Sequence, residues 1–177
     1  MVLDVNAPGL PGHGAAFHTD RIRSLWVPAS PAWLPLAGAP DYGIRNSLYG
    51  AFALDKDTPE AVAASFTVPH DYASALQLQL VWTNLGAGSG NVVWRVGLNN
   101  QGDGGSVGSL STLDTAAIAA PAQNVWKYTS SGASFPNIAA PGQHVLVSCG
   151  RVAADAGDTL ANDAGFLGYL VTYTADM

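Results

Sequence analysis

Two residues have side chains that could act as catalytic nucleophiles. Ser106 lies in the segment 104–108, which matches the G-x-S-x-G pattern that hydrolases use to present a serine between a strand and a helix. No helix-forming run follows this segment, so its glycines favour a flexible loop. Cys149 follows a valine- and leucine-rich run, which is typical of a buried thiol rather than an activated one. We therefore expect that no activity depends on Ser106 or Cys149 and that the protein is not an enzyme.

Two groups of side chains could bind a metal ion. Asp155, Asp158 and Asp163 share one predicted loop, and calcium prefers such oxygen ligands. The ligand spacing of an EF-hand is absent, and aspartates also form turns without a metal, so turn architecture is favoured and a calcium site is the alternative. His13 and His18 lack the further ligands at the spacing that zinc requires. The prediction is that the protein has no metal and no cofactor.

The composition predicts the elements that position these residues. Twelve of the 13 acidic residues are aspartate, and Lys56 and Lys127 are the only lysines. Helices usually cover their exposed face with glutamate and lysine, so this chain is poorly suited to surface helices. It is rich in glycine, proline, valine, threonine and serine. These features predict an all-β fold.

The first 45 residues differ from the rest of the chain. Six of the 11 prolines fall within the first 40 residues, and proline is disfavoured in central strands. We therefore predict two parts, an extended N-terminal arm over 1–45 and a β-sandwich over 46–177. The arm carries several large apolar side chains, so we expect it to pack either on the sandwich or on a neighbouring subunit rather than to be disordered. The apolar residues that we expect to bind a partner are Phe17, Leu25, Trp26 and Trp33.

Alternation of apolar and polar residues predicts about eight strands. The clearest pair covers 76–83 and 92–99, separated by a loop rich in glycine and asparagine. Eight antiparallel strands in two sheets suit a jelly roll, and another type of β-sandwich is the alternative. Trp82, Trp94 and Trp126 fall in these strand patterns, so core packing is favoured over sugar stacking. The segment 113–120 could form a short helix. The remaining predicted strands cover 22–27, 48–54, 62–68, 124–130, 144–151 and 165–174.

Charge and hydropathy exclude several partners. Only 11% of the residues are charged and the net charge is −6, so no basic stripe is available for nucleic acid. The two long uncharged stretches, 73–94 and 128–150, are each interrupted by polar residues, glycine or proline, so neither is expected to span a bilayer. We expect neither a nucleic acid nor a membrane as partner.

Residues 60–174 resemble small jelly-roll virion proteins of tailed bacteriophages, which occur as capsid decoration (cement) proteins and as modules of head and tail fibres. The first 45 residues carry no part of this resemblance. The motifs that carry it are FTVPHDY at 66–72, GNVVWRV at 90–96, QGDG at 101–104, Arg151, DTL at 158–160 and GYLVTY at 168–173.

The resemblance implies a structural function. The expected protein is a capsid decoration protein that binds the major capsid protein lattice, stabilises the head and self-associates as a homotrimer. It would be made in the host cytoplasm and lie on the capsid surface of the virion. Low charge agrees with this interpretation, because burying a neutral surface requires little desolvation of ions. The alternative is a receptor-binding module of a tail or head fibre that recognises a host surface glycan.

Overall fold

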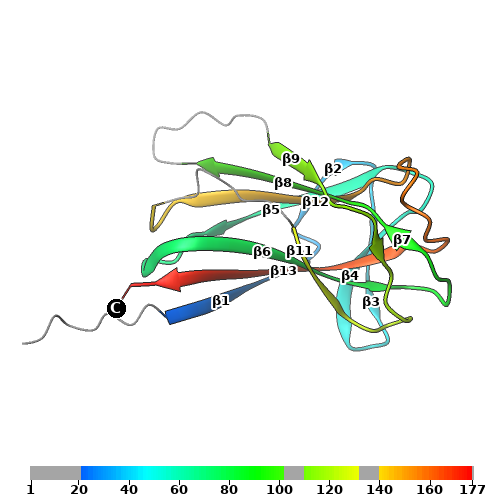
Figure 1. The fold of residues 1–177 in the computed structure, drawn as a ribbon, viewed down its shortest axis with the longest axis horizontal. Coiled ribbons are helices and arrows are strands. Elements are labelled where there is room, and N and C mark those ends of the chain that lie inside the picture. Colours follow the sequence, from blue (N-terminus) through cyan, green and yellow to red (C-terminus); the bar gives the residue numbers. More distant parts are fainter. Residues whose placement is uncertain (1–20, 102–109, 132–139, 177) are drawn as a thin grey trace, which may run out of the picture.

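Two antiparallel sheets face each other in the computed structural model, which describes residues 21–101, 110–131 and 140–176 (Figure 1). None of the described residues forms a helix that is long and apolar enough to cross a bilayer. The six-stranded sheet contains β1 (Arg21–Pro28), β3 (Asp41–Arg45), β4 (Tyr49–Leu54), β6 (Tyr72–Asn84), β11 (Lys127–Ser130) and β13 (Ala164–Ala175). The five-stranded sheet contains β2 (Leu34–Ala37), β5 (Glu60–Thr67), β8 (Trp94–Gln101), β9 (Ser111–Asp114) and β12 (His144–Arg151). A short third sheet pairs β7 (Asn91–Val92) with β10 (Ile118–Ala119).

The strand pairs are nested in the way that defines a jelly roll. In chain order, β4 pairs with β13, β5 with β12, β6 with β11, and β8 with β9. The first of these eight strands therefore pairs with the last, and each inner pair lies within the pair outside it. Wrapping such a ribbon places β4, β13, β6 and β11 in one sheet and β5, β12, β8 and β9 in the other. The predicted all-β, jelly-roll-like sandwich is confirmed.

Aromatic rings fill the core between the sheets. Trp82 of β6 and Trp94 of β8 are both fully buried, and their ring centroids lie 5.2 Å apart in an edge-to-face arrangement. The indole Nε1 of Trp82 donates a hydrogen bond to Oγ1 of Thr129, 2.9 Å away. Phe166 and Tyr169 of β13 continue the cluster with centroids 5.2 Å apart. The prediction that Trp82 and Trp94 pack in the core is therefore confirmed.

The described part of the predicted arm belongs to the sandwich. Residues 21–45, expected to be extended and separate, form β1, β2 and β3, and each strand pairs with the body. The prolines fit because Pro28 ends β1 and Pro35 lies in an edge strand, where a missing N–H costs little. The predicted boundary at residue 45 is thus wrong for 21–45, whereas residues 1–20 lie outside the described residues.

Two further predictions are corrected near the middle of the chain. The segment 113–120, expected to be a short helix, instead contributes to β9 and β10. The strand expected over 124–130 begins only at Lys127, because Asn124 has a positive φ of 61°. β9 pairs with β8 and β10 pairs with β7, and these pairs override the weak local preference of 113–120 for a helix.

Candidate functional site

The outer face of the six-stranded sheet carries most of the exposed aromatic side chains. Leu76, Leu78 and Leu80 of β6 point into the core, so Gln77, Gln79 and the residues in register with them point outward. Register then aligns Trp26, Leu170, Gln79 and Ser130 in one row across four strands. We call this surface the aromatic face. Its aromatic residues are Trp26, Tyr49, Trp126 and Tyr128.

Trp26 is held against the sheet by a glycine. A Cβ atom built on Gly168 would lie 2.9 Å from Cη2 of Trp26 and 2.3 Å from the carbonyl oxygen of Val27, so only a glycine leaves room. Gly168 also has a φ of +142°, and a register shift in β13 occurs between Phe166 and Gly168. The bulge therefore seats the indole of Trp26 over the backbone of β13 while leaving the side chain 41% exposed.

Tyr49 and Trp126 form the other end of the aromatic face. Their ring centroids lie 5.7 Å apart at 84°, and the Tyr49 hydroxyl donates to Oδ1 of Asn124 at 3.3 Å. Tyr49 packs on a small apolar cluster that sits on the outside of the sheet, as does Leu170. The cluster consists of Ala51, Val81 and Leu167. It links the two ends of the aromatic face, because Leu170 neighbours Trp26 in the row described above.

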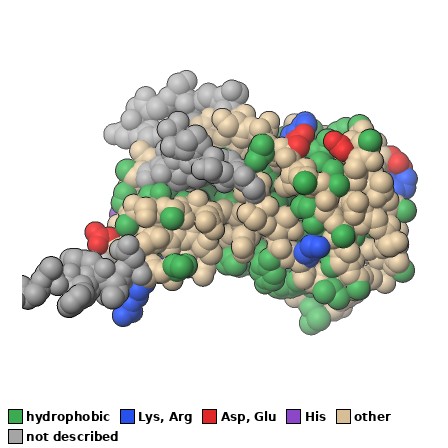
Figure 2. All heavy atoms as spheres, in the orientation of Figure 1, with side chains coloured by type: hydrophobic (Ala, Val, Ile, Leu, Met, Phe, Trp, Pro, Cys, Tyr) green, Lys and Arg blue, Asp and Glu red, His purple; other side chains and the backbone are tan. Residues whose placement is uncertain are grey.

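Most outward side chains of the aromatic face are uncharged, but Arg45 of β3 lies opposite Tyr49 on the same face. The outward positions on β1, β6, β11 and β13 include no charged residue. Charged side chains are few and scattered across the view in Figure 2 as well. Aromatic rings with amides and hydroxyls around them can cover an apolar ligand surface and exchange hydrogen bonds at its rim. The outward polar residues with exposed or half-buried side chains on these strands include Ser24, Gln77, Gln79, Ser130, Thr172 and Thr174.

The predicted partner-binding residues lie in different environments. Trp26 is exposed on the aromatic face, and Leu25 is half-buried against the core. Trp33 is only 6% exposed and stacks on Tyr169 with ring centroids 6.2 Å apart, so it cannot be part of a partner-binding patch. Phe17 lies outside the described residues. The structure therefore brings none of the other three together into the single patch that we expected.

Sequence reasoning missed the contribution of β11 to the aromatic face. Trp126 was assigned to the core, but it is 46% exposed, and Tyr128 is 54% exposed. The signal lay in the alternate positions, because Lys127 and Thr129 are polar and occupy the other side of the strand. An edge strand with polar inward residues leaves its aromatic residues outside.

The candidate nucleophiles do not form a catalytic site among the described residues. Cys149 is fully buried, and this burial raises the pKa of its thiol, so the thiol stays protonated at neutral pH. The Tyr169 hydroxyl is also fully buried, and it donates to the carbonyl oxygen of Ser148 at 2.7 Å. Ser106 lies outside the described residues. Cys149 is thus the buried thiol that its sequence context predicted.

The three aspartates of the predicted calcium loop do not come together. Oδ1 of Asp155 accepts the backbone N–H of Gly157 at 2.7 Å, which is an Asx turn. Asp158 is buried and binds Arg151, with 2.7 Å between Nη2 and Oδ1. Within the described ranges, no three histidine, cysteine, aspartate or glutamate side chains are grouped as metal ligands. The favoured interpretation of this loop as turn architecture fits these contacts.

Arg151 joins the loops at one end of the sandwich. Besides its pair with Asp158, its guanidinium donates to the carbonyl oxygens of Leu160 and Asn162, both at 2.7 Å, and of Leu54 at 3.4 Å. These carbonyls belong to the end of β4 and to the segment that leads into β13. Asp158 in turn accepts the backbone N–H of Val93 at 3.1 Å. We call this part of the molecule, with the loops 55–59, 85–90 and 152–163, the loop end.

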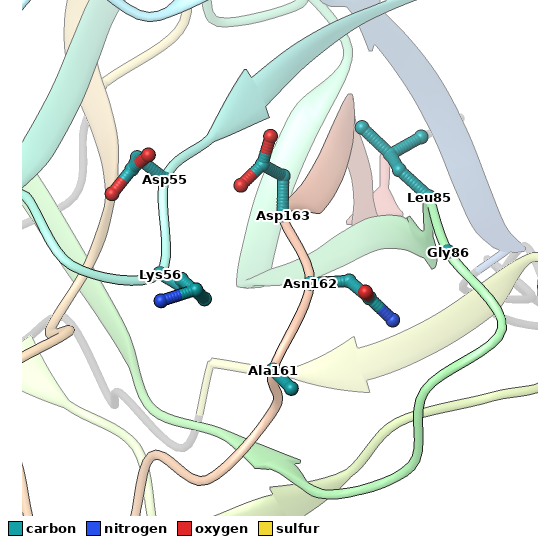
Figure 3. A pocket seen from close by; sticks show the side chains of 7 residues that line it. All are labelled: Asp55, Lys56, Leu85, Gly86, Ala161, Asn162 and Asp163. Carbon is teal, nitrogen blue, oxygen red and sulfur yellow. The ribbon is translucent and has the colours of Figure 1, made fainter.

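A polar pocket opens at the loop end (Figure 3). It has a volume of about 310 Å³ and is lined from three loops, chiefly by Asp55, Lys56, Asn162 and Asp163. Backbone N–H groups of Asp57 and Thr58 donate to Asp55 and lower the pKa of its carboxyl group, so Asp55 is ionised at neutral pH. The volume of the pocket is at the lower limit for small-molecule sites, and no aromatic residue lines the pocket.

Comparison with known proteins finds similar solved structures but no family. No family model matches the chain, and no curated protein matches it. Among solved structures, the chain is similar to the structure of TmCBM61 in complex with β-1,4-galactotriose. The two chains are 12% identical with a TM-score of 0.38, and the alignment covers 86% of this chain and 88% of that one.

Proposed function

We propose that this protein is a non-enzymatic binding module that recognises a neutral glycan through the aromatic face. The observation that carries the proposal is the presence of four aromatic side chains on one sheet face whose remaining outward residues on β1, β6, β11 and β13 are uncharged. A sugar ring has an apolar C–H face and a rim of hydroxyls. Indole and phenol rings can cover the C–H face, and amides and hydroxyls of the protein can form hydrogen bonds with the sugar hydroxyls.

The lack of charge narrows the class of ligand. An anionic glycan would bring carboxylates or sulfates that need cationic partners when they lose water. The outward positions of β1, β6, β11 and β13 offer none, so a cationic contact from this sheet would have to come from Arg45, which lies opposite Tyr49 on β3. Together with the resemblance to phage virion proteins, this favours a receptor-binding module of a tail or head fibre.

The test compares neutral and acidic sugars on matched variants. Isothermal titration would measure binding of neutral hexose oligosaccharides and of uronic-acid oligosaccharides of equal length. We expect binding of neutral sugars only, and about a tenfold loss of affinity in Trp26→Ala, which corresponds to about 1.4 kcal/mol. Leu34→Ala is the control because Leu34 is 70% exposed on β2, which belongs to the five-stranded sheet and not to the sheet that carries the aromatic face. Equal affinity of Trp26→Ala and the wild type would contradict the proposal.

A second candidate function is capsid decoration, with the major capsid protein lattice as partner and a homotrimer as the assembly on the capsid surface of the virion. Exposed aliphatic side chains favour it, because they gain from burial against protein rather than from stacking on sugar. Ile22 is 82% exposed, Ile44 74% and Leu48 84%. Co-sedimentation of the full chain with undecorated particles tests this function. Deletion of 1–20 is the suitable truncation, since a deletion of 1–35 would also remove β1.

A further inference from the structure

One edge of the six-stranded sheet is longer than the other sheet edges. β1 has eight residues and pairs along its whole length with β13, and no other described strand pairs with it. It forms the lower border of the sheet in Figure 1. The edge strands β2, β9 and β11 have four residues each, and β3 has five. β1 thus presents eight residues with no described strand on their outer side, and the next longest such row, 72–78 of β6, has seven.

β1 also lacks most of the features that protect edge strands. Natural edges are shortened, bulged, interrupted by proline or charged, because unpaired N–H and C=O groups attract another strand. The register of β1 with β13 runs without a shift, and its single proline, Pro28, is its last residue. Its two charges are Arg21 and Arg23. Arg23 is already paired with Asp71, with 2.7 Å between Nη1 and Oδ2.

We propose that β1 pairs with β1 of a second copy, antiparallel, about a two-fold axis at Ser24. The sheets of the two copies then form one continuous sheet. In this register Ile22 lies opposite Trp26 of the second copy, and Trp26 lies opposite Ile22. The 82% exposed Ile22 thereby gains an aromatic neighbour on the outward face.

The neighbouring registers are less favourable. Paired residues must share a face, so outward residues have to meet outward residues, which excludes slips by one position. A two-fold axis at Arg23 would place the two Arg23 side chains directly opposite each other, and like charges at such positions destabilise a sheet. An axis at Leu25 would place Ile22 opposite Pro28, which has no N–H to donate. The Ser24 register avoids both problems.

This pairing has a functional consequence. An antiparallel pair has its two-fold axis perpendicular to the sheet, so the aromatic faces of both copies point in the same direction. Two such faces on one rigid sheet would bind a repeating surface with higher avidity than a single copy. The pairing itself requires no ligand, so it can fail or hold independently of glycan recognition.

Cysteine cross-linking tests the register. In Ser24→Cys, the two introduced thiols face each other across the axis, and we expect a disulfide-linked dimer under mild oxidation. Thr172→Cys is the matched control, since Thr172 pairs with Ser24 on the same face but lies one strand inside the edge. The native Cys149 is buried and does not compete. Equal cross-linking of both variants, or none in Ser24→Cys, would overturn the register.

Sedimentation equilibrium on the full chain tests the association itself. Pairing of one strand buries less than the roughly 1,200 Å² of a standard interface, so we expect a weak, concentration-dependent dimer. Ile22→Lys adds a positive charge beside Arg21 and Arg23, and we expect it to weaken dimerisation about tenfold without affecting the fold. A chain that stays monomeric, forms a trimer without Ser24→Cys cross-links, or dimerises equally well with Ile22→Lys would overturn the proposal.

Discussion

Arg151 at the loop end and Trp26 on the aromatic face both have large side chains with a polar group, but they differ in burial and in their bonding partners. The Arg151 side chain is completely buried, and it binds one carboxylate and three carbonyl oxygens of its own chain. Trp26 is 41% exposed and rests on a glycine. The loop end satisfies its polar groups internally, whereas the aromatic face leaves its side chains available. The comparison indicates that the loop end stabilises the fold and the aromatic face is free to bind.

The largest expected effect concerns the loop end. Arg151→Met removes the hydrogen bonds to three carbonyl oxygens and leaves Asp158 as a buried, unpaired charge. We expect a loss of about 3–5 kcal/mol in the free energy of unfolding, measured by urea denaturation. Arg95→Met is the control, since its pair with Asp114 is exposed and should contribute less than about 1 kcal/mol. Similar losses in the two variants would contradict the role assigned to burial.

A smaller effect is expected at Gly168, which supports both the packing of β1 on β13 and the position of Trp26 on the aromatic face. Gly168→Ala forces a Cβ atom against the carbonyl oxygen of Val27 and requires a φ that alanine rarely adopts. We expect a loss of about 1–3 kcal/mol in stability, together with a displaced Trp26 that shows a changed fluorescence spectrum. Gly43→Ala on β3 serves for comparison, because its Cβ atom would meet only ordinary contacts. An unchanged Trp26 spectrum in Gly168→Ala would show that the glycine does not seat the indole.

On the aromatic face itself, a substitution should reduce ligand affinity while changing the stability of the fold only slightly. Trp126→Ala removes an indole that is 46% exposed and has one edge-to-face contact, with Tyr49. We expect a loss of less than about 1.5 kcal/mol in thermal or urea unfolding, and about a tenfold loss of affinity for a neutral oligosaccharide in titration calorimetry. A large loss of stability with no change in affinity would assign Trp126 to the fold.

The smallest effect is a pH dependence at the exposed pair. The hydrogen bonds from Arg95 lower the pKa of Asp114, so this carboxyl group contributes stability above its unfolded pKa of about 3.9. That contribution is lost as the pH falls through the lower pKa of the folded protein. Asp114→Asn should therefore be slightly less stable than the wild type at about pH 7, with a difference that narrows in thermal unfolding towards about pH 3. A difference that widens on acidification would contradict the sign.

Regular strands were largely predictable from the sequence. The alternation in 144–151 indicated the bounds of β12, because Val145, Val147 and Cys149 all point inward and the strand lies between two others. The short strands β2, β3, β9 and β10 were missed. These strands contain proline or glycine, or are too short to show a period. Their positions depend on pairing with the strands beside them.

The candidate site was predictable only in part. Apolar context led us to predict both Trp26 and Trp33 as partner-binding residues, but only Trp26 is exposed, and Trp33 is buried in the core. Which tryptophan faces outward depends on the strand register and on the bulge that precedes Gly168, and neither is visible in local patterns. The aromatic face also joins residues from β1, β4 and the start of β11, which are far apart in the chain.

The nested strand order also determines when the protein can fold during its synthesis. The central strand of the six-stranded sheet, β13, is the last described strand to leave the ribosome, yet β1, β4 and β6 all pair with it. At about 5–20 residues per second, β1 is made on the order of ten seconds before β13, the one strand of the described residues that pairs with it. The nascent chain therefore carries apolar strands without a completed sheet until β13 has been made. The yield of the folded sandwich should depend on how well these unpaired strands are kept from aggregating during that interval.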